Sequence, residues 1–416
     1  MVKKQSPSAR SRLPGELPPI GDTEHREKTR RRRQARRAGK PPRGIYTAIA
    51  VLLTCAVAMV VWVNRENLKP ANLSEWVQTQ MLGLATGDGY PLKLGSENVK
   101  PRNFISSGKN VFLTSDTAVQ AYNGSAKQLF SRKHSFAEPM MKVSENRVLI
   151  YNLSGTGYQL ESPLRTLVNG TADGKLMGGD VCANGRYALL TQQDGYCGKL
   201  TVYLPDGQVA YSYSFSEYYP TAVALNSSGT RAVVTASNTK DGELTGVVYE
   251  LNFSSKTSVK PLAQFDNTFF IDVSYTEQGG ILAVGDTQTT ALSASGKVLH
   301  TYSYGDGELS TWELSKNMAV LGLSSFHNAA DSTLAAVSAE GKLLGSVQVK
   351  GNISSVSGYG DTTMAALCNK QVLAFTSGGH AAGSCSADSN ARAIALRSGR
   401  EVYVLEVSEV ELQKLS

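Results

Sequence analysis

Histidine and tryptophan are scarce in this chain, and their scarcity excludes several kinds of active site. Among its 416 residues there are five histidines and three tryptophans. His134, His300, His327 and His380 lie far apart, with no second ligand at the spacing of a zinc site. A pyrroloquinoline quinone enzyme is expected to dock its cofactor with repeated tryptophans, which this chain lacks. We therefore expect no metal and no cofactor.

The common catalytic motifs are absent as well. The sequence contains no G-x-S-x-G nucleophile elbow, no Walker loop and no H-E-x-x-H zinc motif. Carboxylates are plentiful, so composition leaves open a hydrolase or lyase that uses two of them as acid and base. The sequence does not show which of the candidates could pair, and we assign no catalytic residue. These candidates are Asp116, Asp180, Asp272, Asp286 and Asp361.

Cysteine is also infrequent, with five in the chain. Cys55 lies in an apolar run, and the other four allow three disulfide pairings. The predicted strand positions place the sequential partners too far apart for a bond. We therefore expect free thiols at Cys182, Cys197, Cys368 and Cys385.

Positive charge is concentrated at the N-terminus. Residues 1–43 contain 14 Lys/Arg against four Asp/Glu, whereas the remaining residues contain 28 basic and 31 acidic side chains. The segment also holds six prolines and few large apolar residues, so it cannot bury enough surface to offset its ordering entropy. We predict a disordered basic tail over residues 1–43.

A long apolar run follows the tail directly. Residues 44–63, "GIYTAIAVLLTCAVAMVVWV", lack any charged side chain, and a helix of this length spans about 30 Å, the thickness of a bilayer core. We predict a transmembrane signal anchor here, which makes the lipid bilayer a partner. A buried core helix, cleavage after "AVA" at 56–58 and lipidation of Cys55 are the alternatives.

The basic residues before this run predict its orientation. Cations resist translocation, so the N-terminus is expected in the cytoplasm and residues 64–416 outside it. Binding of nucleic acid by the tail is not expected, because aromatic residues do not interleave with its charges. The residues that form this topology signal are Arg30, Arg31, Arg32, Arg33, Arg36, Arg37, Lys40 and Arg43.

Residues 64–90 form a connector with its own local pattern. Within 72–91, apolar residues such as Leu73, Trp76 and Met81 recur at helical spacing, and Gly83 or Gly87 would end a helix. We predict a short amphipathic helix that packs on the following domain, with a partner-binding or membrane-lying helix as the alternative.

From about residue 91 the chain reads as many short strands. Apolar runs such as "RVLIYNL" and "GVVYEL" are broken by turns every five to ten residues. One class of turn precedes an apolar strand eight times, at intervals of roughly 36 to 49 residues, as in "SSGKNVFL" (106–113) and "ANGRYALL" (183–190). A second class, such as "LPDGQVAY" (204–211), recurs midway and supplies the positive φ of tight hairpins.

This period fits four strands per repeat and predicts an all-β propeller over residues 91–416. Strand-forming segments remain at both ends, "YPLKL" near the start and "EVYVLEV" with "VELQKL" at the end. A last blade built from both ends would close the ring and remove its exposed edges. The prediction is therefore eight blades, with seven as the alternative and a β-sandwich or an open solenoid as other architectures.

One aromatic run could serve as a ligand surface. The stretch "YSYSFSEYYP" (211–220) could stack sugars or peptides on a rim of the ring, or it could fill the packing between blades. The residues of this possible stacking patch are Tyr211, Tyr213, Phe215, Tyr218 and Tyr219.

The layout resembles an uncharacterised family of Firmicutes membrane-anchored β-propellers. The resemblance is most specific in "GDGYPLKLGSENVKPRNF" (87–104), "TSDTAVQAYN" (114–123) and "SRKHSFAEPMMKVSENRVLIYN" (131–152), and it covers residues 72 to about 410. It implies the same fold and topology and carries no assigned activity.

The sequence thus predicts an extracytoplasmic, membrane-anchored propeller. Because no catalytic group of residues stands out, we expect a non-enzymatic binding or scaffold module for a protein, peptide or cell-envelope ligand. The alternative is a cell-envelope hydrolase or lyase that uses carboxylates in the channel.

Overall fold

The computed structural model describes residues 43–63, 78, 85–95, 97–255, 259–325 and 331–416. The chain divides into two compact units, Met1–Leu68 and Lys69–Ser416, which are described separately. The predicted tail lies outside the described residues, as do the arginines and the lysine of the topology signal, apart from the backbone of Arg43. Most of the predicted connector helix lies outside them too.

The first unit contains helix α2 (Arg43–Val63). The described side chains, 44–59, are exposed, including the apolar Ile45, Leu52 and Met59. Within the described part of the chain, no helix combines the length and the apolar character needed to cross a bilayer. The transmembrane anchor over 44–63 therefore stays a prediction.

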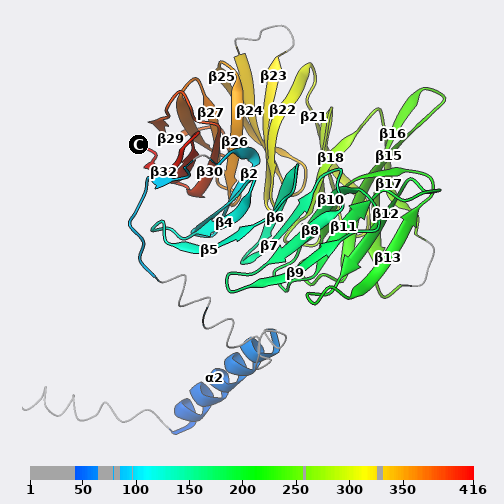
Figure 1. Cartoon of the computed structure of the whole chain (residues 1–416), viewed down its shortest axis with the longest axis horizontal. Helices are drawn as coiled ribbons and strands as arrows, with labels where there is room; N and C mark the ends of the chain where they lie inside the picture. The colour runs from blue at the N-terminus through cyan, green and yellow to red at the C-terminus, as the bar shows by residue number, and fades with distance from the viewer. Residues whose placement is uncertain (1–42, 64–77, 79–84, 96, 256–258, 326–330) are drawn as a thin grey trace, which may run out of the picture. The chain divides into compact units, whose positions relative to one another are not determined.

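The second unit is a ring of eight four-stranded antiparallel sheets, which confirms the all-β propeller and the choice of eight blades over seven (Figure 1). Consecutive innermost strands contact one another around the ring, and β30 contacts β2, so the ring is closed. The innermost strands of blades 1 to 8 are β2 (Val99–Ser107), β6 (Pro139–Ser144), β10 (Leu176–Val181), β14 (Tyr219–Leu225), β18 (Phe270–Tyr275), β22 (Gly307–Leu314), β26 (Ile353–Tyr359) and β30 (Ala393–Ser398).

The second and third strands of each blade form the core. Most of their residues are buried because each blade is covered by a neighbour on both faces, as in Tyr187–Thr191, where every residue is buried. The second strands are β3 (Asn110–Ser115), β7 (Arg147–Asn152), β11 (Tyr187–Thr191), β15 (Arg231–Lys240), β19 (Ile281–Gly285), β23 (Met318–Ser325), β27 (Thr363–Cys368) and β31 (Glu401–Leu405). The third strands are β4 (Ala118–Tyr122), β8 (Gly157–Glu161), β12 (Gly198–Tyr203), β16 (Glu243–Asn252), β20 (Gln288–Leu292), β24 (Asp331–Ser338), β28 (Gln371–Thr376) and β32 (Glu409–Lys414).

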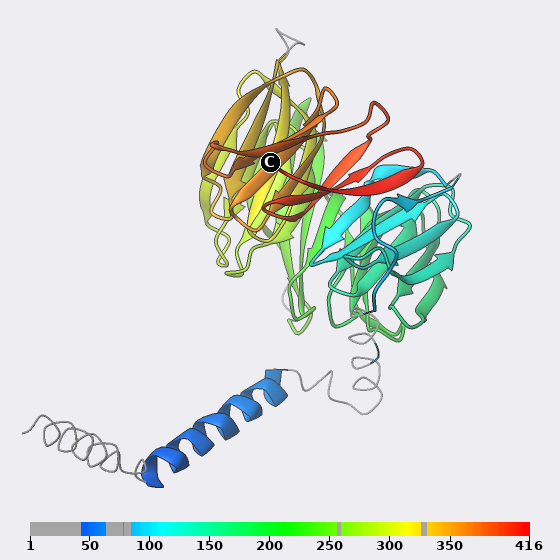
Figure 2. The same cartoon turned by 90° about the vertical axis from the view of Figure 1, so that its left-hand side faces the viewer.

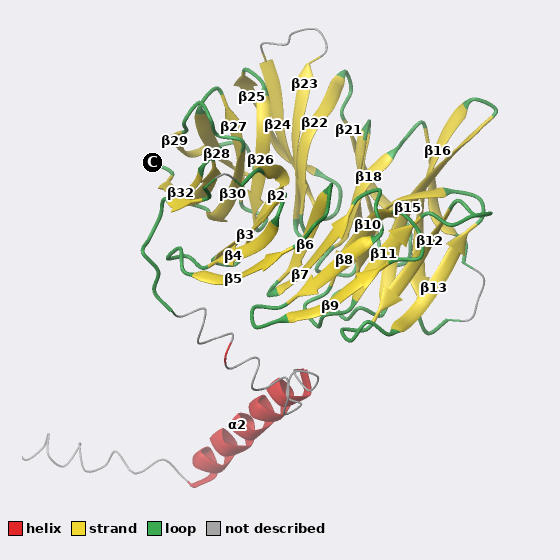
Figure 3. Cartoon of the chain, viewed as in Figure 1, coloured by secondary structure: helices red, strands yellow, loops and turns green. Residues whose placement is uncertain are grey.

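The outermost strands are largely polar and exposed, which explains why their hydrophobic pattern is weak. They are β5 (Gln128–Lys133), β9 (Thr166–Thr171), β13 (Val209–Phe215), β17 (Pro261–Asp266), β21 (Val298–Ser303), β25 (Leu343–Lys350), β29 (Ala381–Ser386) and β1 (Leu92–Lys93). Figure 3 shows how the loops are confined to the ends of these strands.

The eighth blade joins the first and the last strands of the propeller, as predicted. Its strand order is β1-β32-β31-β30, and β1 pairs Leu92 with Val410 and Lys93 with Glu409. Figure 2 shows the red C-terminal strands beside the cyan N-terminal part of the ring. The ring of Tyr90 packs against that of Tyr403 at 5.3 Å between centroids, and the Tyr403 hydroxyl donates to the Lys109 carbonyl of blade 1 at 2.9 Å.

The alternation of strand directions gives the propeller two faces. The turns after the first and third strands lie on one face, and those after the second and fourth strands lie on the other. The chain reaches the propeller on the first of these, where Gly89 donates to the Ser125 carbonyl and Asn123 donates to the Ala85 carbonyl. We call this the entry face and the other the opposite face. Both predicted classes of turn lie on the entry face.

Candidate functional site in the central channel

The innermost strands bring a group of charged and aromatic side chains together at the centre of the ring. Because each blade contributes one such strand, residues far apart in the sequence meet there. We call this group the channel cluster, and it consists of Arg102 on β2, Lys142 on β6, Asp180 on β10, Asp272 on β18 and Trp312 on β22.

An ion pair spans the channel. The Lys142 Nζ lies 3.6 Å from the Asp272 Oδ1, which joins blade 2 to blade 5 across the ring rather than around it. Both side chains are partly buried, with 37% and 23% of their surface exposed. The Asp272 carboxylate raises the pKa of Lys142 above its ordinary value, with a smaller contribution from Asp180. Lys142 therefore stays charged beside Asp272, and the negative charge of Asp180 favours the same state.

Asp272 also holds Trp312 in place. The Trp312 Nε1–H donates to Asp272 Oδ2 at 3.1 Å, and the Arg102 guanidinium lies 4.5 Å from the centroid of the Trp312 ring. Such a cation–π contact is electrostatically favourable because the ring face is negative. One continuous chain of contacts thus links blades 2, 5, 6 and 1.

Asp180 and Glu313 extend the polar contacts to the remaining blades. Asp180 accepts from the backbone N–H of Leu225 at 2.7 Å, and burial raises the pKa of its carboxyl. Glu313 accepts from the Gly358 N–H at 3.2 Å, and burial raises its pKa to about 7. The Ser357 hydroxyl hydrogen-bonds Glu313 and accepts from the Leu396 N–H of blade 8 at 2.9 Å.

This arrangement is suited to holding the ring together. Asp272 pairs with Lys142, Asp180 is bonded to the backbone of the neighbouring blade, and so is Glu313. A general acid–base pair needs two carboxyl groups that face a space for the substrate, with pKa values set apart. The described channel side chains contact one another instead, so the alternative of a hydrolase or lyase is not favoured.

The five candidate carboxylates have different positions. Asp272 pairs with Lys142 in the channel, and Asp180 is near enough to both to influence their charge. Asp116 and Asp286 lie in exposed turns of the opposite face, between β3 and β4 and between β19 and β20, and Asp361 lies in an exposed turn of the entry face. These three do not approach the channel cluster.

The sequence analysis did not identify the residues that surround the two channel carboxylates. Arg102, Lys142, Trp312 and Glu313 each lie in a strand that follows an opposite-face loop, in "VKPRNFISS", "PMMKVS" and "GELSTWEL". A charged side chain in the first strand of a blade, beside the more apolar second strand, is the pattern that could have indicated them.

Most of the predicted stacking patch lies between blades 3 and 4. Phe215 is 2% exposed and packs edge-on against Tyr249, with ring centroids 5.5 Å apart. Tyr211 stacks on Phe253 at 4.9 Å, and Tyr213 and Tyr218 pack against the same hydrophobic cluster. These side chains contribute to the packing between blades, and a role in ligand stacking stays a prediction for the partly exposed Tyr211, Tyr213 and Tyr218.

Tyr219 is the exception in this patch. It begins β14 on the opposite face, where 59% of it is exposed. Two further aromatic side chains are exposed in loops of that face, Tyr196 at 49% and Phe269 at 39%. A role in ligand stacking stays a prediction for Tyr219.

The structure places the four cysteines of the propeller as free thiols. Cys182 and Cys368 are buried, and their thiols donate to the carbonyls of Asn226 and Lys350 at 3.2 and 3.0 Å. Cys197 and Cys385 are half-buried. Burial raises the pKa of the Cys182 thiol to about 12 and that of Cys385 to about 11, which disfavours the reactive thiolate.

The two faces of the ring carry opposite charge. In the described loops of the entry face, nine basic side chains outnumber six acidic ones: Lys109, Lys127, Arg165, Arg186, Lys260, Lys297, Lys316, Lys342 and Arg400, against Asp88, Glu145, Asp206, Glu277, Glu340 and Asp361. In the described loops of the opposite face, eleven acidic side chains outnumber three basic ones: Glu97, Asp116, Glu138, Asp173, Asp194, Glu217, Asp241, Asp286, Asp306, Asp388 and Glu406, against Lys175, Lys370 and Arg392.

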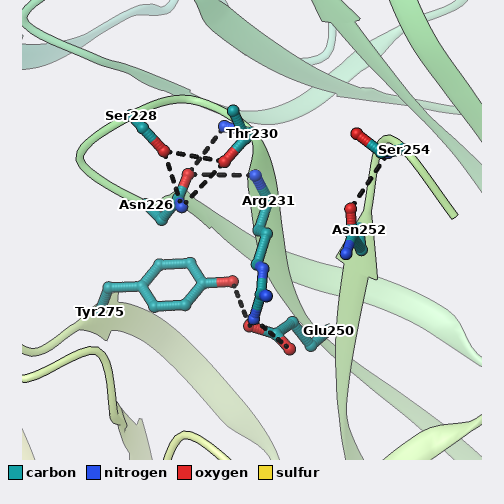
Figure 4. Close-up of polar contacts among 8 residues, drawn as sticks. All are labelled: Asn226, Ser228, Thr230, Arg231, Glu250, Asn252, Ser254 and Tyr275. Atoms are coloured by element: carbon teal, nitrogen blue, oxygen red, sulfur yellow. Dashed lines mark hydrogen bonds and ion pairs between the residues drawn. The ribbon is translucent and has the colours of Figure 1, made fainter.

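Hydrogen bonds fix the entry-face loop of blade 4 (Figure 4). The Asn226 Oδ1 accepts from the N–H groups of Thr230 and Arg231 at 2.8 and 3.0 Å. The Arg231 guanidinium lies 3.5 Å from Glu250, which also accepts from the Tyr275 hydroxyl of blade 5 at 3.1 Å. Neighbouring blades are joined here by side chains as well as by apolar packing.

Loops of other blades bind this same loop. Arg186 of blade 3 donates to the Gly229 carbonyl at 3.0 Å, and Lys316 of blade 6 lies 3.4 Å from the Ser227 hydroxyl. The entry-face end of the channel is therefore crossed by polar contacts, as its middle is.

A buried carboxyl outside the channel gives a pH prediction. Glu161 on β8 is 0% exposed, and burial raises its pKa to about 7, although Thr166 and Arg132 favour the charged form. A raised pKa means that the folded state binds the proton more tightly than the unfolded chain. The stability that Glu161 contributes is thus complete below pH 4.5 and lost as the pH rises through 7.

We therefore expect Glu161→Gln to stabilise the propeller at pH 8 by about 2 kcal/mol and to have little effect at pH 4.5. Denaturant unfolding of the full chain at both pH values measures this difference. The exposed Glu308→Gln is the control and should behave like the parent chain. Equal effects of Glu161→Gln at both pH values would contradict the raised pKa of Glu161 in the folded state.

Comparison with solved structures supports the fold. The C-terminal WD40 domain of Sif2 has a TM-score of 0.56 at 10% identity, and the match covers 79% of this chain and 98% of that domain. BamB from Moraxella catarrhalis has a TM-score of 0.51 at 10% identity, covering 80% of this chain and 100% of the other. Sqt1 from Chaetomium thermophilum has a TM-score of 0.51 at 11% identity, covering 79% and 98%.

These likenesses concern the fold alone, because the identities are low. No curated protein matches the sequence. One family model does match, and its match extends over residues 90–415, the whole propeller. The chain therefore belongs to the family of unknown function DUF5711.

Proposed function

We propose that this protein is a binding module: a propeller anchored by residues 44–63, facing outside the cytoplasm, that holds a protein or cell-envelope ligand without catalysing a reaction. One observation carries the proposal. The charged side chains of the channel contact one another across the ring, which leaves the loop faces as the surfaces open to a ligand. The WD40-like propeller fold often serves as such a module.

Two features support the anchor. Residues 44–63 carry no charged side chain, and the described apolar side chains of α2 are exposed, as expected for a helix that lipid covers. The cations that precede it favour a cytoplasmic N-terminus.

The orientation can be tested by labelling in intact cells. We expect a membrane-impermeant maleimide to modify Asp241→Cys, in an exposed turn, and to modify Arg10→Cys only after permeabilisation. The native thiols require a parallel sample of the parent chain as background. The reverse pattern would overturn the proposed topology.

The opposite face is the better candidate for the ligand surface. Tyr196, Tyr219 and Phe269 belong to blades 3, 4 and 5, and exposed aromatic side chains are frequent anchors in protein interfaces. Their surroundings are acidic, so a ligand with basic or hydrogen-bond-donating groups fits them best.

A photo-crosslinking experiment tests this surface. We expect a benzoylphenylalanine at position 219 to form a discrete adduct in cells, whereas the same probe at position 359 forms none. Tyr359 is the matched control because it is 44% exposed and ends β26 on the entry face. With the adduct partner purified, Tyr219→Ser is expected to weaken binding about tenfold and Tyr359→Ser to leave it unchanged. Equal adducts at both positions would count against the assignment.

A further inference from the structure

We propose that the entry face of the propeller docks on anionic phospholipid headgroups of the membrane that holds α2. This inference rests on the proposed anchor and adds an orientation to it. The opposite face, with its aromatic side chains, then points away from the membrane and towards a ligand.

The charges of both faces favour the same orientation. An anionic surface attracts the entry face, whose described loops carry nine basic and six acidic side chains, and repels the opposite face, with eleven acidic and three basic ones. Either face alone would give a modest preference. Because they lie at opposite ends of the strands, their effects add.

Exposed basic side chains are distributed widely over the entry face. Lys109 and Lys127 belong to blade 1, Lys297 to blade 5, Lys342 to blade 6 and Arg400 to blade 8, and all five are exposed. Their blades lie on different sides of the ring. A flat anionic surface can therefore meet several of them at once, which a small ligand could not.

The loops between them are held in place. The loop at 226–230 is fixed by the Asn226 side chain, and Arg186 and Lys316 bond to it from blades 3 and 6 (Figure 4 shows the Asn226 contacts). Docking on this face therefore needs little ordering of the backbone, which lowers its entropic cost.

The chain also reaches the propeller on this face. Gly87 and Gly89 hydrogen-bond to Ser125 in the turn between β4 and β5. Residues 64–84 lie between α2 and the described start of the propeller, and a chain of that length spans at most about 70 Å. Such a tether keeps the propeller close to the bilayer, so even weak contacts with headgroups are enough for docking. The charge of the two faces then determines which face makes these contacts.

The test uses the full chain in two kinds of vesicle, phosphatidylcholine alone and a 7:3 mixture of phosphatidylcholine and phosphatidylglycerol. A membrane-impermeant acylating reagent modifies exposed lysines, and mass spectrometry measures the rate at each. We expect Lys109, Lys297 and Lys342 to react at least threefold more slowly in the anionic vesicles, whereas Lys175 and Lys370 of the opposite face react equally in both. The difference should vanish in 0.5 M NaCl, where exposed charges are screened.

Charge reversal gives a matched pair of variants. Lys109→Glu with Lys297→Glu and Lys342→Glu is expected to abolish the protection of Lys127. The control, Lys133→Glu with Lys175→Glu and Lys370→Glu, changes the net charge equally and should retain it. Equal rates in both lipids, or protection on the opposite face, would overturn the inference.

Carbonate extraction separates this inference from the anchor. A chain that remains in phosphatidylcholine vesicles at alkaline pH but shows no lipid-dependent protection retains the anchor and refutes the docking. A chain that is extracted refutes the anchor, and the footprint in anionic vesicles still reports whether the entry face binds.

Discussion

A chain that ends after Ser408 is expected to lose the folded propeller. This truncation removes β32, which pairs with β31 and is the strand to which β1 is hydrogen-bonded. It also removes Val410 and Leu415, which are 0% and 8% exposed, and the partly buried Leu412. Three such side chains contribute about 5–9 kcal/mol by burial, which is comparable to the whole stability of a typical domain.

Thermal unfolding in detergent, followed by circular dichroism, measures this effect. We expect the truncated chain to show no cooperative transition and to aggregate through the edges of β1 and β31. Lys414→Ala, an exposed change in the same strand, is the control and should unfold as the parent chain does. A sharp transition at an unchanged temperature in the truncated chain would show that the ring does not need its closing blade.

Lys142→Met is expected to lower the free energy of unfolding by about 2–3 kcal/mol. The substitution keeps the length of the side chain but leaves Asp272 and Asp180 near the channel without their cation. Loss of one partner from a fully buried pair costs about 3–5 kcal/mol, and the partial exposure of Lys142 and Asp272 reduces that figure.

A double-mutant cycle with Asp272→Asn identifies the pair as the cause. The double variant should regain about 1–2 kcal/mol over the sum of the single effects, because it leaves no uncompensated charge between these two positions. Lys199→Met is the matched control, since Lys199 lies 3.4 Å from an Asp173 that is 89% exposed, and a surface pair of this kind contributes less than about 1 kcal/mol. Equal losses at Lys142 and Lys199 would refute the importance of the cross-channel pair.

The blades were predictable because their turns obey a local rule. A tight turn needs a residue that adopts positive φ, and Gly108 and Gly185 do so at 60° and 85°, directly before the second strands of blades 1 and 3. One such turn precedes the second strand of each blade, so counting eight of them in the sequence predicts eight blades. The shared closing blade followed from the strand segments left at both ends.

The channel cluster could not be predicted because its contacts are not local. Lys142 and Asp272 are separated by three blades of sequence, and the residues around each of them do not show that the other lies nearby. In the sequence, Trp312 mattered only because the chain has too few tryptophans to bind a quinone cofactor. In the fold it contacts both Arg102 and Asp272. The aromatic run at 211–219 was ambiguous for the opposite reason, because alternation shows that side chains share a face but does not show what covers it.

The attachment of the chain at the entry face has a mechanical consequence. β1 contains two residues and would peel from β32 under a small pull if the force reached it directly. The segment before it is bonded to blade 1 instead: the Gly89 N–H to the Ser125 carbonyl at 3.1 Å, the Asn123 amide to the Ala85 carbonyl at 2.7 Å, and the Tyr90 hydroxyl to the Asn123 carbonyl at 3.1 Å. Tension along the tether is therefore carried by the body of blade 1, and the seam that closes the ring is shielded from the load.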